Sequence, residues 1–118
     1  MASSNKTGLG ETFDLLTHPY RRYVLYYLRT HSGVVSVDTL TAMLTNELEG
    51  SSATPGSDTA ERIEIALHHM HLPKLADAGL ITFAQDRRSI ELGEIHGYGQ
   101  VIDQAARIDG YALPATGD

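Results

Sequence analysis

The sequence predicts a fold that is mainly α with a small β-hairpin, and therefore an α+β domain. Apolar residues recur at helical spacing in several segments, and Pro, Gly and Ser punctuate the chain between them. One short stretch, residues 80–92, instead alternates around a tight turn and is typical of a hairpin. The chain of 118 residues can bury one modest core, and it contains no cysteine for disulfides or thiolate metal sites.

The first predicted helices lie on either side of a proline. Residues 11–18 supply a first helical segment, and Pro19 restarts the chain because proline is favoured in a first helical turn. The helix that follows runs to about Thr30, with Val24, Leu25 and Leu28 on one face.

A short extended piece and a second amphipathic helix follow. Val34 and Val35 form the extended piece, and Ser36 is positioned as an N-cap for a helix that reaches about Leu48. The next stretch, residues 49–57, is rich in Gly, Ser and Pro and predicts a flexible loop.

The following helix begins at Asp58 or Thr59 and is apolar on two sides. At 100° per residue one side carries a single stripe, and the nearly opposite side carries two more apolar residues, so the helix is expected to be packed between other elements. The stripe is Ile63, Leu67 and Met70, and the opposite pair is Ile65 and Leu72. Pro73 is expected to kink this helix or start a new turn, and Gly79 to end it.

The last predicted elements are a hairpin and a terminal helix. Strands at 80–84 and 88–92 flank a turn at 85–87, and a helix is expected from about Gln100 to Ile108. This order of elements is that of a winged helix-turn-helix with an extra C-terminal helix.

Two segments carry a resemblance to known regulators. HLPKLADAGLI, residues 71–81, resembles the end of the recognition helix of winged-helix proteins, and HPYRRYVLYYL, residues 18–28, resembles their opening helix. The chain more closely resembles haloarchaeal winged helix-turn-helix domains (DUF7344-like, similar to ArsR/MarR-type regulators), which pair an FDLL-x-x-PRRRYVLYYL opening with a YHxHLPKLADAGV segment. Here Tyr20 stands where that family has Arg, and His68 where it commonly has Tyr.

The resemblance covers roughly residues 11–92 and implies the fold and a regulatory, DNA-associated role. We therefore expect a flexible N-terminus at 1–10, the winged domain at 11–92, a C-terminal helix at 93–110 and a flexible tail at 111–118. The excess of Arg over Lys and the acidic balance fit a halophilic, archaeal source. The lack of a signal-like or membrane-spanning run predicts a cytoplasmic protein.

Net charge speaks mildly against nucleic acid, because the formal charge is −6 and DNA-binding domains usually present a basic face. The charge is polarised, however: residues 19–31 hold three arginines and no acid, whereas residues 38–49 hold acids and no base. We predict a DNA-binding transcriptional regulator, with the helix at 58–72 in the major groove and the wing at 80–92 on the backbone or in the minor groove. The alternative is a winged-helix protein-interaction module, which the acid excess favours, and a metal or small-ligand sensor is a more distant third.

The candidate DNA-binding residues are basic or imidazole side chains in the two matched segments, in the predicted helix at 58–72 and in the wing. They are Arg21, Arg22, Arg62, His68, His69, His71, Lys74, Arg87 and Arg88.

Each group of candidates has a structural alternative. The histidines could be packed or hydrogen-bonded, whereas a metal site lacks a complete ligand set, since the three point in different directions on a helix. The wing arginines could be solvated turn residues. Arg21 or Arg22 could pair with an acid such as Asp14.

A homodimer is the predicted assembly. Tyrosine buries area while keeping a polar tip, which suits interfaces, and the terminal helix offers an apolar stripe. The candidate contacts are Tyr23, Tyr26, Tyr27, Val101, Ile102, Ala105 and Ile108. The alternative is that the C-terminal helix folds back over the tyrosines of the same chain. No catalytic set, phosphate-binding loop, cofactor or metal motif is recognisable, so an enzyme is not expected.

Overall fold

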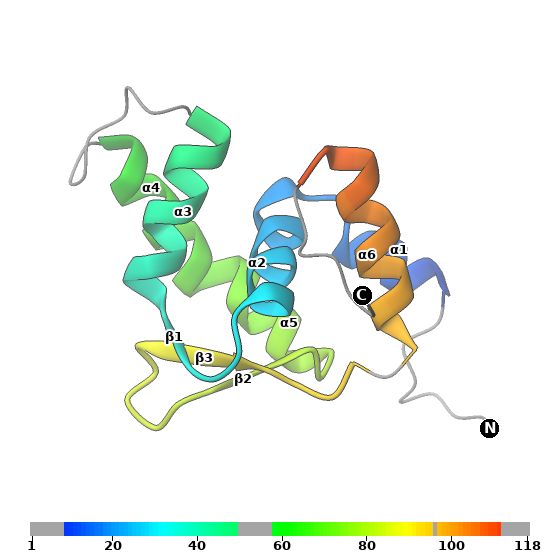
Figure 1. Ribbon diagram of the computed structural model, residues 1–118. Helices are drawn as coiled ribbons and strands as arrows, with labels where there is room; N and C mark the ends of the chain where they lie inside the picture. Colours follow the sequence, from blue (N-terminus) through cyan, green and yellow to red (C-terminus); the bar gives the residue numbers. More distant parts are fainter. Residues whose placement is uncertain (1–8, 50–57, 96, 112–118) are drawn as a thin grey trace.

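The computed structural model describes residues 9–49, 58–95 and 97–111, which form helices on one side of a small sheet (Figure 1). In chain order the elements are α1 (Leu9–Leu15), α2 (Pro19–Thr30), β1 (Val35–Ser36), α3 (Val37–Glu49), α4 (Asp58–Ala66), the π-helical turn η1 (Leu67–His71), α5 (Leu72–Asp77), β2 (Ile81–Phe83), β3 (Ser89–Leu92) and α6 (Tyr98–Asp109). The central helix is α2, with α3 and α4 on one side of it and α1 and α6 on the other (Figure 1).

Local capping explains where two helices begin. The Nδ1 atom of His18 accepts from the Tyr20 backbone N–H at 3.1 Å, and Pro19 needs no partner for a missing N–H in the first turn of α2. The Ser36 hydroxyl accepts from the Thr39 N–H at 3.0 Å at the start of α3. The predicted bounds of α2 and the predicted N-cap of α3 are thus confirmed.

The sheet has three antiparallel strands in the order β1-β3-β2. The predicted hairpin is β2–β3, and Val35, Ile90 and Phe83 lie side by side across the three strands. The predicted extended piece is shifted by one residue, because Val35 pairs with β3 while Val34 remains 60% exposed. This pairing ties the start of α3 to the wing.

The core is built around the buried face of α2, which contributes Val24, Leu25, Tyr26 and Leu28. On one side lie α3 and a separate long helix formed by α4, η1 and α5, which is named the third helix from here on and is distinct from α3. On the other side α6 packs against α2. The predicted fold class is confirmed: the chain is mainly α with a small antiparallel sheet, in a winged-helix-like arrangement with an extra C-terminal helix.

The third helix departs from the predicted packing at two positions. Met70, predicted in the buried stripe, is 56% exposed, and Ile65, predicted to be packed on the opposite side, is 57% exposed. For Met70 the cause is η1, where the Leu72 N–H donates to the Leu67 carbonyl five residues back. A π turn holds more residues than an α turn, so it moves Met70 outward and turns His71 into the core.

Pro73 helps to explain why the π turn lies here. Proline has no N–H to donate to the carbonyl four residues earlier, so the α-helical ladder is already broken at this point. The expectation that Pro73 starts a new turn is confirmed, because it lies in the first turn of α5. Gly79 follows α5 with a φ of 82°, a left-handed conformation that suits glycine.

Several predictions fall largely outside the described residues, namely the flexible ends at 1–10 and 111–118 and the loop at 49–57. Among the helices of residues 9–49, 58–95 and 97–111, none has the length and apolar character needed to cross a bilayer.

Candidate nucleic-acid interface

One line of exposed side chains runs along the third helix, on the side opposite its buried stripe. The buried side is a run of residues at four-residue spacing: Ile63, Leu67, His71 and Leu75. In an α-helix, residues four positions apart are offset by about 40° around the helix axis, and the π turn removes part of that offset. The exposed side is another run: Asp58, Arg62, Ile65 and His69. Arg62, Ile65 and His69 are therefore presented together to solvent.

The π turn separates the three predicted histidine contacts. His68 and His69 are exposed beside Met70, whereas His71 is 1% exposed and cannot reach DNA from its buried position. Their divergence also removes them as a shared ligand set. In the part of the chain that the structure describes, no group of three or more His, Asp or Glu side chains could hold a metal ion.

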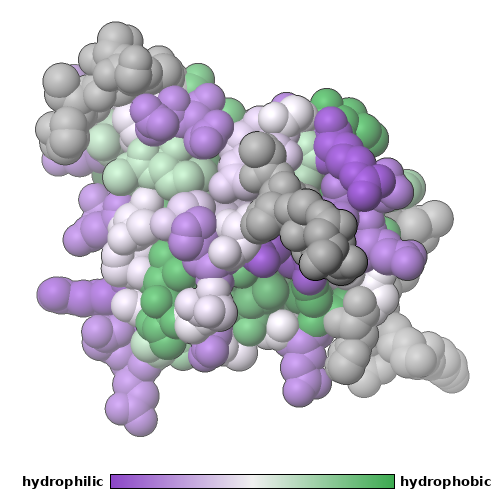
Figure 2. Space-filling model, in the orientation of Figure 1, coloured by the Kyte–Doolittle hydropathy of each residue, from purple (hydrophilic) through white to green (hydrophobic). Residues whose placement is uncertain are grey.

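The wing ends in a turn that exposes both predicted arginines. Arg87 has a φ of 59°, the one positive value for a non-glycine residue in the described ranges, and its N–H donates to the Ala84 carbonyl at 2.9 Å. Its guanidinium lies 4.3 Å from the centre of the Phe83 ring, a cation–π contact that restricts where the charge points. Arg88 is exposed, with its backbone N–H bound to Asp86. Hydrophilic side chains project from the region of the wing in Figure 2.

Arg21 is not an exposed contact but the centre of a buried network. It is 6% exposed, and its Nε and Nη2 atoms donate to the Leu15 and Asp14 carbonyls at 2.7 and 3.1 Å. Those carbonyls belong to the last turn of α1, which lacks intrahelical donors. Nη1 lies 3.0 Å from Nδ1 of His71, and because a guanidinium can only donate, Nδ1 is the acceptor. Arg21 therefore joins α1 to the π turn of the third helix.

Two further rings enclose His71. Its ring centre lies 4.2 Å from that of His18 and 5.3 Å from that of Tyr20. Burial, with smaller contributions from the charges of His18 and Arg21, lowers the pKa of His71 to about 4. Burial also lowers the pKa of Arg21, against the opposing effect of Asp14. His71 is therefore a neutral acceptor at neutral pH.

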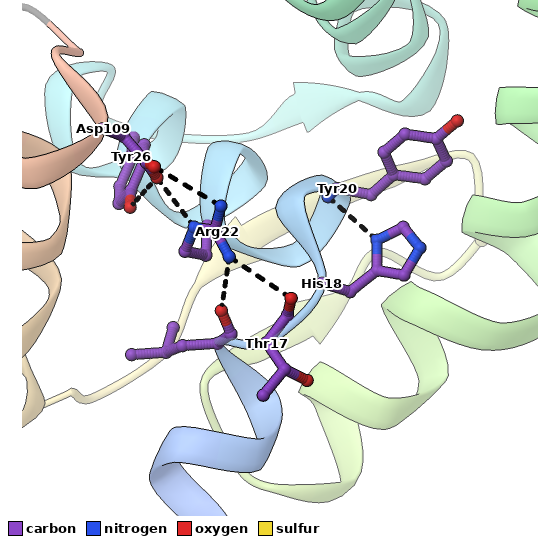
Figure 3. A network of polar contacts seen from close by, with 7 residues as sticks. Thr17, His18, Tyr20, Arg22, Tyr26 and Asp109 are labelled. Atoms are coloured by element: carbon purple, nitrogen blue, oxygen red, sulfur yellow. Dashed lines mark hydrogen bonds and ion pairs between the residues drawn. The ribbon is translucent and has the colours of Figure 1, made fainter.

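Arg22 is likewise engaged inside the molecule (Figure 3). It donates to the Leu16 carbonyl at 2.8 Å, after the end of α1, and forms an ion pair with Asp109 of α6 at 2.7 Å. Hydrogen bonding to Asp109 raises the pKa of Arg22. Burial raises the pKa of Asp109, but the hydrogen bonds from Arg22 and Tyr26 outweigh it, so the net shift is downward. Of these two predicted DNA contacts, Arg21 is buried against α1 and His71, and Arg22 is half-buried and engaged with the end of α1 and with α6.

The C-terminal helix covers α2 of its own chain, as in the intramolecular alternative for the tyrosines. Tyr26 is fully buried and donates to Asp109 at 2.6 Å, while Arg29 pairs with Asp103 at 2.6 Å. Tyr23 and Tyr26 contact Tyr111 through ring centres 5.5 and 5.2 Å apart. Sequence patterns gave no sign that these two aspartates would be the anchors of α6.

The predicted dimer contacts are divided accordingly. Tyr26 and Ile102 are buried within one chain and are not available to a partner subunit. Tyr23, Tyr27, Val101 and Ala105 are half-buried, whereas Ile108 is 86% exposed. Hydrophobic atoms reach the surface near the C-terminal end of α6 in Figure 2.

The exposed cations of the described residues differ in whether they are paired. The three arginines of α2 are all engaged with α1, α6 or His71, and the predicted contact Lys74 lies 3.5 Å from Asp14. Among the described residues Arg62, Arg87 and Arg88 form no ion pair. Asp58 and Glu61 lie exposed beside Arg62, so the start of α4 repels phosphate, whereas the wing carries Arg87 and Arg88 together with the exposed acids Asp86 and Glu91.

A profile of the family described as "Domain of unknown function (DUF7344)" matches residues 13–91. No curated protein and no solved structure matches the chain. The matched range runs from α1 to β3 and includes both the third helix and the wing.

Proposed function

We propose that this chain, which belongs to the DUF7344 family, is a DNA-binding transcriptional regulator of the winged helix-turn-helix type. In this proposal α4, η1 and the first residue of α5, together residues 58–72, enter the major groove, and the wing, residues 80–92, lies on the adjacent backbone or minor groove. The resemblance to haloarchaeal domains and to ArsR- and MarR-type regulators supports a cytoplasmic, regulatory role.

The observation that carries the proposal is the pairing of a solvent-facing line on the third helix with a wing whose turn exposes two arginines. Arg62 and His69 can bond base edges, and Ile65 between them can contact a thymine methyl group. Arg87 and Arg88 supply the phosphate contacts that the acidic start of α4 does not. Among the described residues, three exposed arginines without an ion pair lie at these two elements, and a further one, Arg107, lies on α6.

The test is to remove both wing charges. Phosphate contacts add affinity without reading bases, so Arg87→Ala/Arg88→Ala is expected to weaken binding equally across sequences and to reduce the salt slope by about 2. The control is Arg107→Ala, since Arg107 is exposed on α6, away from the wing. If Arg107→Ala lowers the salt slope as much as the double variant does, the wing is not part of the interface.

A second candidate is a winged-helix module that binds protein. It is favoured by the 57% exposure of Ile65 and the 56% exposure of Met70, which place apolar side chains among acids on the third helix. Met70→Lys separates the two functions, because Met70 lies outside the line of Arg62, Ile65 and His69. An added cation there maintains or raises affinity for DNA, but it disrupts an apolar contact with a protein partner.

Homodimerisation is proposed through the outer face of α6. Val101, Ala105 and Ile108 recur at helical spacing and are half-buried or exposed, so a second copy can pack there while Tyr26 and Ile102 stay inside each subunit.

A further inference from the structure

The π turn of the third helix is an unusual element that requires support. π turns are rare and are found mostly inside α-helices, often at functional sites. Here the turn holds Leu67 and His71 in the core while His68, His69 and Met70 are all exposed.

The orientation of the DNA-facing half depends on this turn. If residues 67–71 returned to α geometry, the segment before them would rotate by roughly 100° relative to α5. Arg62 and Ile65 would then rotate together away from the outward side, and Ile63 would leave the core stripe. The π turn therefore fixes which side chains the third helix presents.

The contacts of His71 are the ones that hold the turn from outside the helix. Arg21 approaches its Nδ1 at 3.0 Å and is itself fixed by two carbonyls at the end of α1. A second link between α1 and the third helix is the Lys74–Asp14 ion pair at 3.5 Å, which is exposed and correspondingly weak. Buried hydrogen bonds to a charged donor are stronger and more directional than such pairs.

We propose that Arg21 and His71 are positioning residues that lock the π turn and thereby couple α1 to the orientation of the DNA-reading side chains. The inference rests on the proposed function for its consequence, because neither side chain touches DNA. Its structural half, the locking of the turn, stands independently of what the third helix binds.

The adjacent arginine provides a matched control. Arg21 and Arg22 both donate to backbone carbonyls at the end of α1 or just after it, but only Arg21 contacts His71. Arg21→Gln and Arg22→Gln therefore each weaken the junction of α1 and α2, whereas only Arg21→Gln releases the turn. A second pair is His71→Leu, which removes the acceptor, and His71→Gln, whose amide oxygen can still accept from Arg21.

The first measurement is amide exchange on the full chain. Leu72 donates across the π turn, and Leu44 of α3 reports global opening because it is fully buried elsewhere in the core. Relative to Leu44, exchange at Leu72 is expected to accelerate about tenfold in Arg21→Gln and His71→Leu, and to change little in Arg22→Gln and His71→Gln. Equal acceleration in Arg21→Gln and Arg22→Gln overturns the proposal.

The second measurement is binding to two DNA probes: the duplex that the wild-type chain selects from a random pool, and a scrambled duplex of equal length. Arg21→Gln and His71→Leu are expected to lower the ratio of selected to scrambled affinity about tenfold while leaving scrambled binding unchanged. An unchanged ratio in both variants contradicts the coupling. If the wild-type chain selects no duplex, the proposed function fails, and the exchange comparison alone decides whether Arg21 and His71 lock the turn.

Discussion

The Oδ2 atom of Asp109 accepts two hydrogen bonds from α2, one from the Tyr26 hydroxyl at 2.6 Å and one from Nε of Arg22 at 2.7 Å. One carboxylate near the C-terminal end of α6 therefore satisfies both a fully buried phenol and a cation that also binds the Leu16 carbonyl. This arrangement makes α6 part of the core of a single chain.

The hydroxyl of Tyr26 gives the first prediction. Tyr26→Phe keeps the ring but removes the bond to Asp109, and it should lower the free energy of unfolding by about 1–2 kcal/mol. Denaturant unfolding measures the loss. The matched control is Tyr27→Phe, because the Tyr27 hydroxyl has no hydrogen-bond partner among the described residues. Equal losses for the two variants would show that the bond to Asp109 does not stabilise the fold.

The buried imidazole gives a pH dependence. The pKa of His71 is about 4 in the folded chain against 6.5 as its ordinary value, so between these values the unfolded chain binds more protons. The contribution of neutral His71 to the free energy of unfolding is therefore complete above pH 6.5. It is lost as the pH falls towards 4, and the loss is at most about 3 kcal/mol.

Unfolding free energies measured from pH 7 to pH 4 test this dependence. His71→Leu should reduce their slope with pH but not abolish it, since the pKa of His18 is also lowered by burial and by the neighbouring arginines. A slope that is the same in both proteins would mean that His71 is not buried as a neutral ring.

The buried stripe of the third helix gives a stability prediction. Leu75 is fully buried at the end of that stripe, and Leu75→Ala should cost about 2–5 kcal/mol through lost burial and a residual cavity. Arg62 lies on the opposite side, and Arg62→Ala should change stability by less than about 0.5 kcal/mol. Thermal unfolding of the two variants checks the register of the helix, and similar midpoints would contradict it.

The exposed end of α6 gives a test of assembly. Ile108 is 86% exposed, so Ile108→Ser should leave the stability of the subunit within about 0.5 kcal/mol of its original value. If two copies pair through α6, light scattering should find the wild type as a dimer and this variant shifted towards monomer. A variant that is still fully dimeric would place the interface elsewhere.

Much of the fold could be predicted from local signals. Pro19 and Ser36 mark helix starts through chemistry that acts within a few residues, and the alternation around residues 85–87 marks the hairpin. These signals needed no knowledge of distant neighbours. A constant 100° per residue does not predict the π turn, although the spacing of Ile63, Leu67, His71 and Leu75 already exceeds the α-helical period.

The candidate site was harder to predict, because its composition depends on tertiary partners. Arg21 and Arg22 have the sequence features of exposed cations. In the structure, however, both donate to carbonyls at the end of α1 or just after it, and Arg22 also pairs with Asp109, which is distant in the sequence. His71 occupies a core position at which the pattern predicts an apolar residue. The hydrogen bond from Arg21 satisfies Nδ1 of the buried ring and so reduces the cost of burying it. The 57% exposure of Ile65 could not be predicted either, because it depends on which elements pack against α4.

The central claim, that the third helix reads DNA bases while the wing holds the backbone, is tested most directly by selecting duplexes from a random pool at the salt concentration of the native host. The wild-type chain should enrich a defined motif, Arg62→Ala and His69→Ala should each change particular positions of it, and Arg87→Ala/Arg88→Ala should lower recovery without changing the motif. Failure of the wild-type chain to enrich any motif, or a motif unaffected by the Arg62 and His69 variants, would contradict the claim.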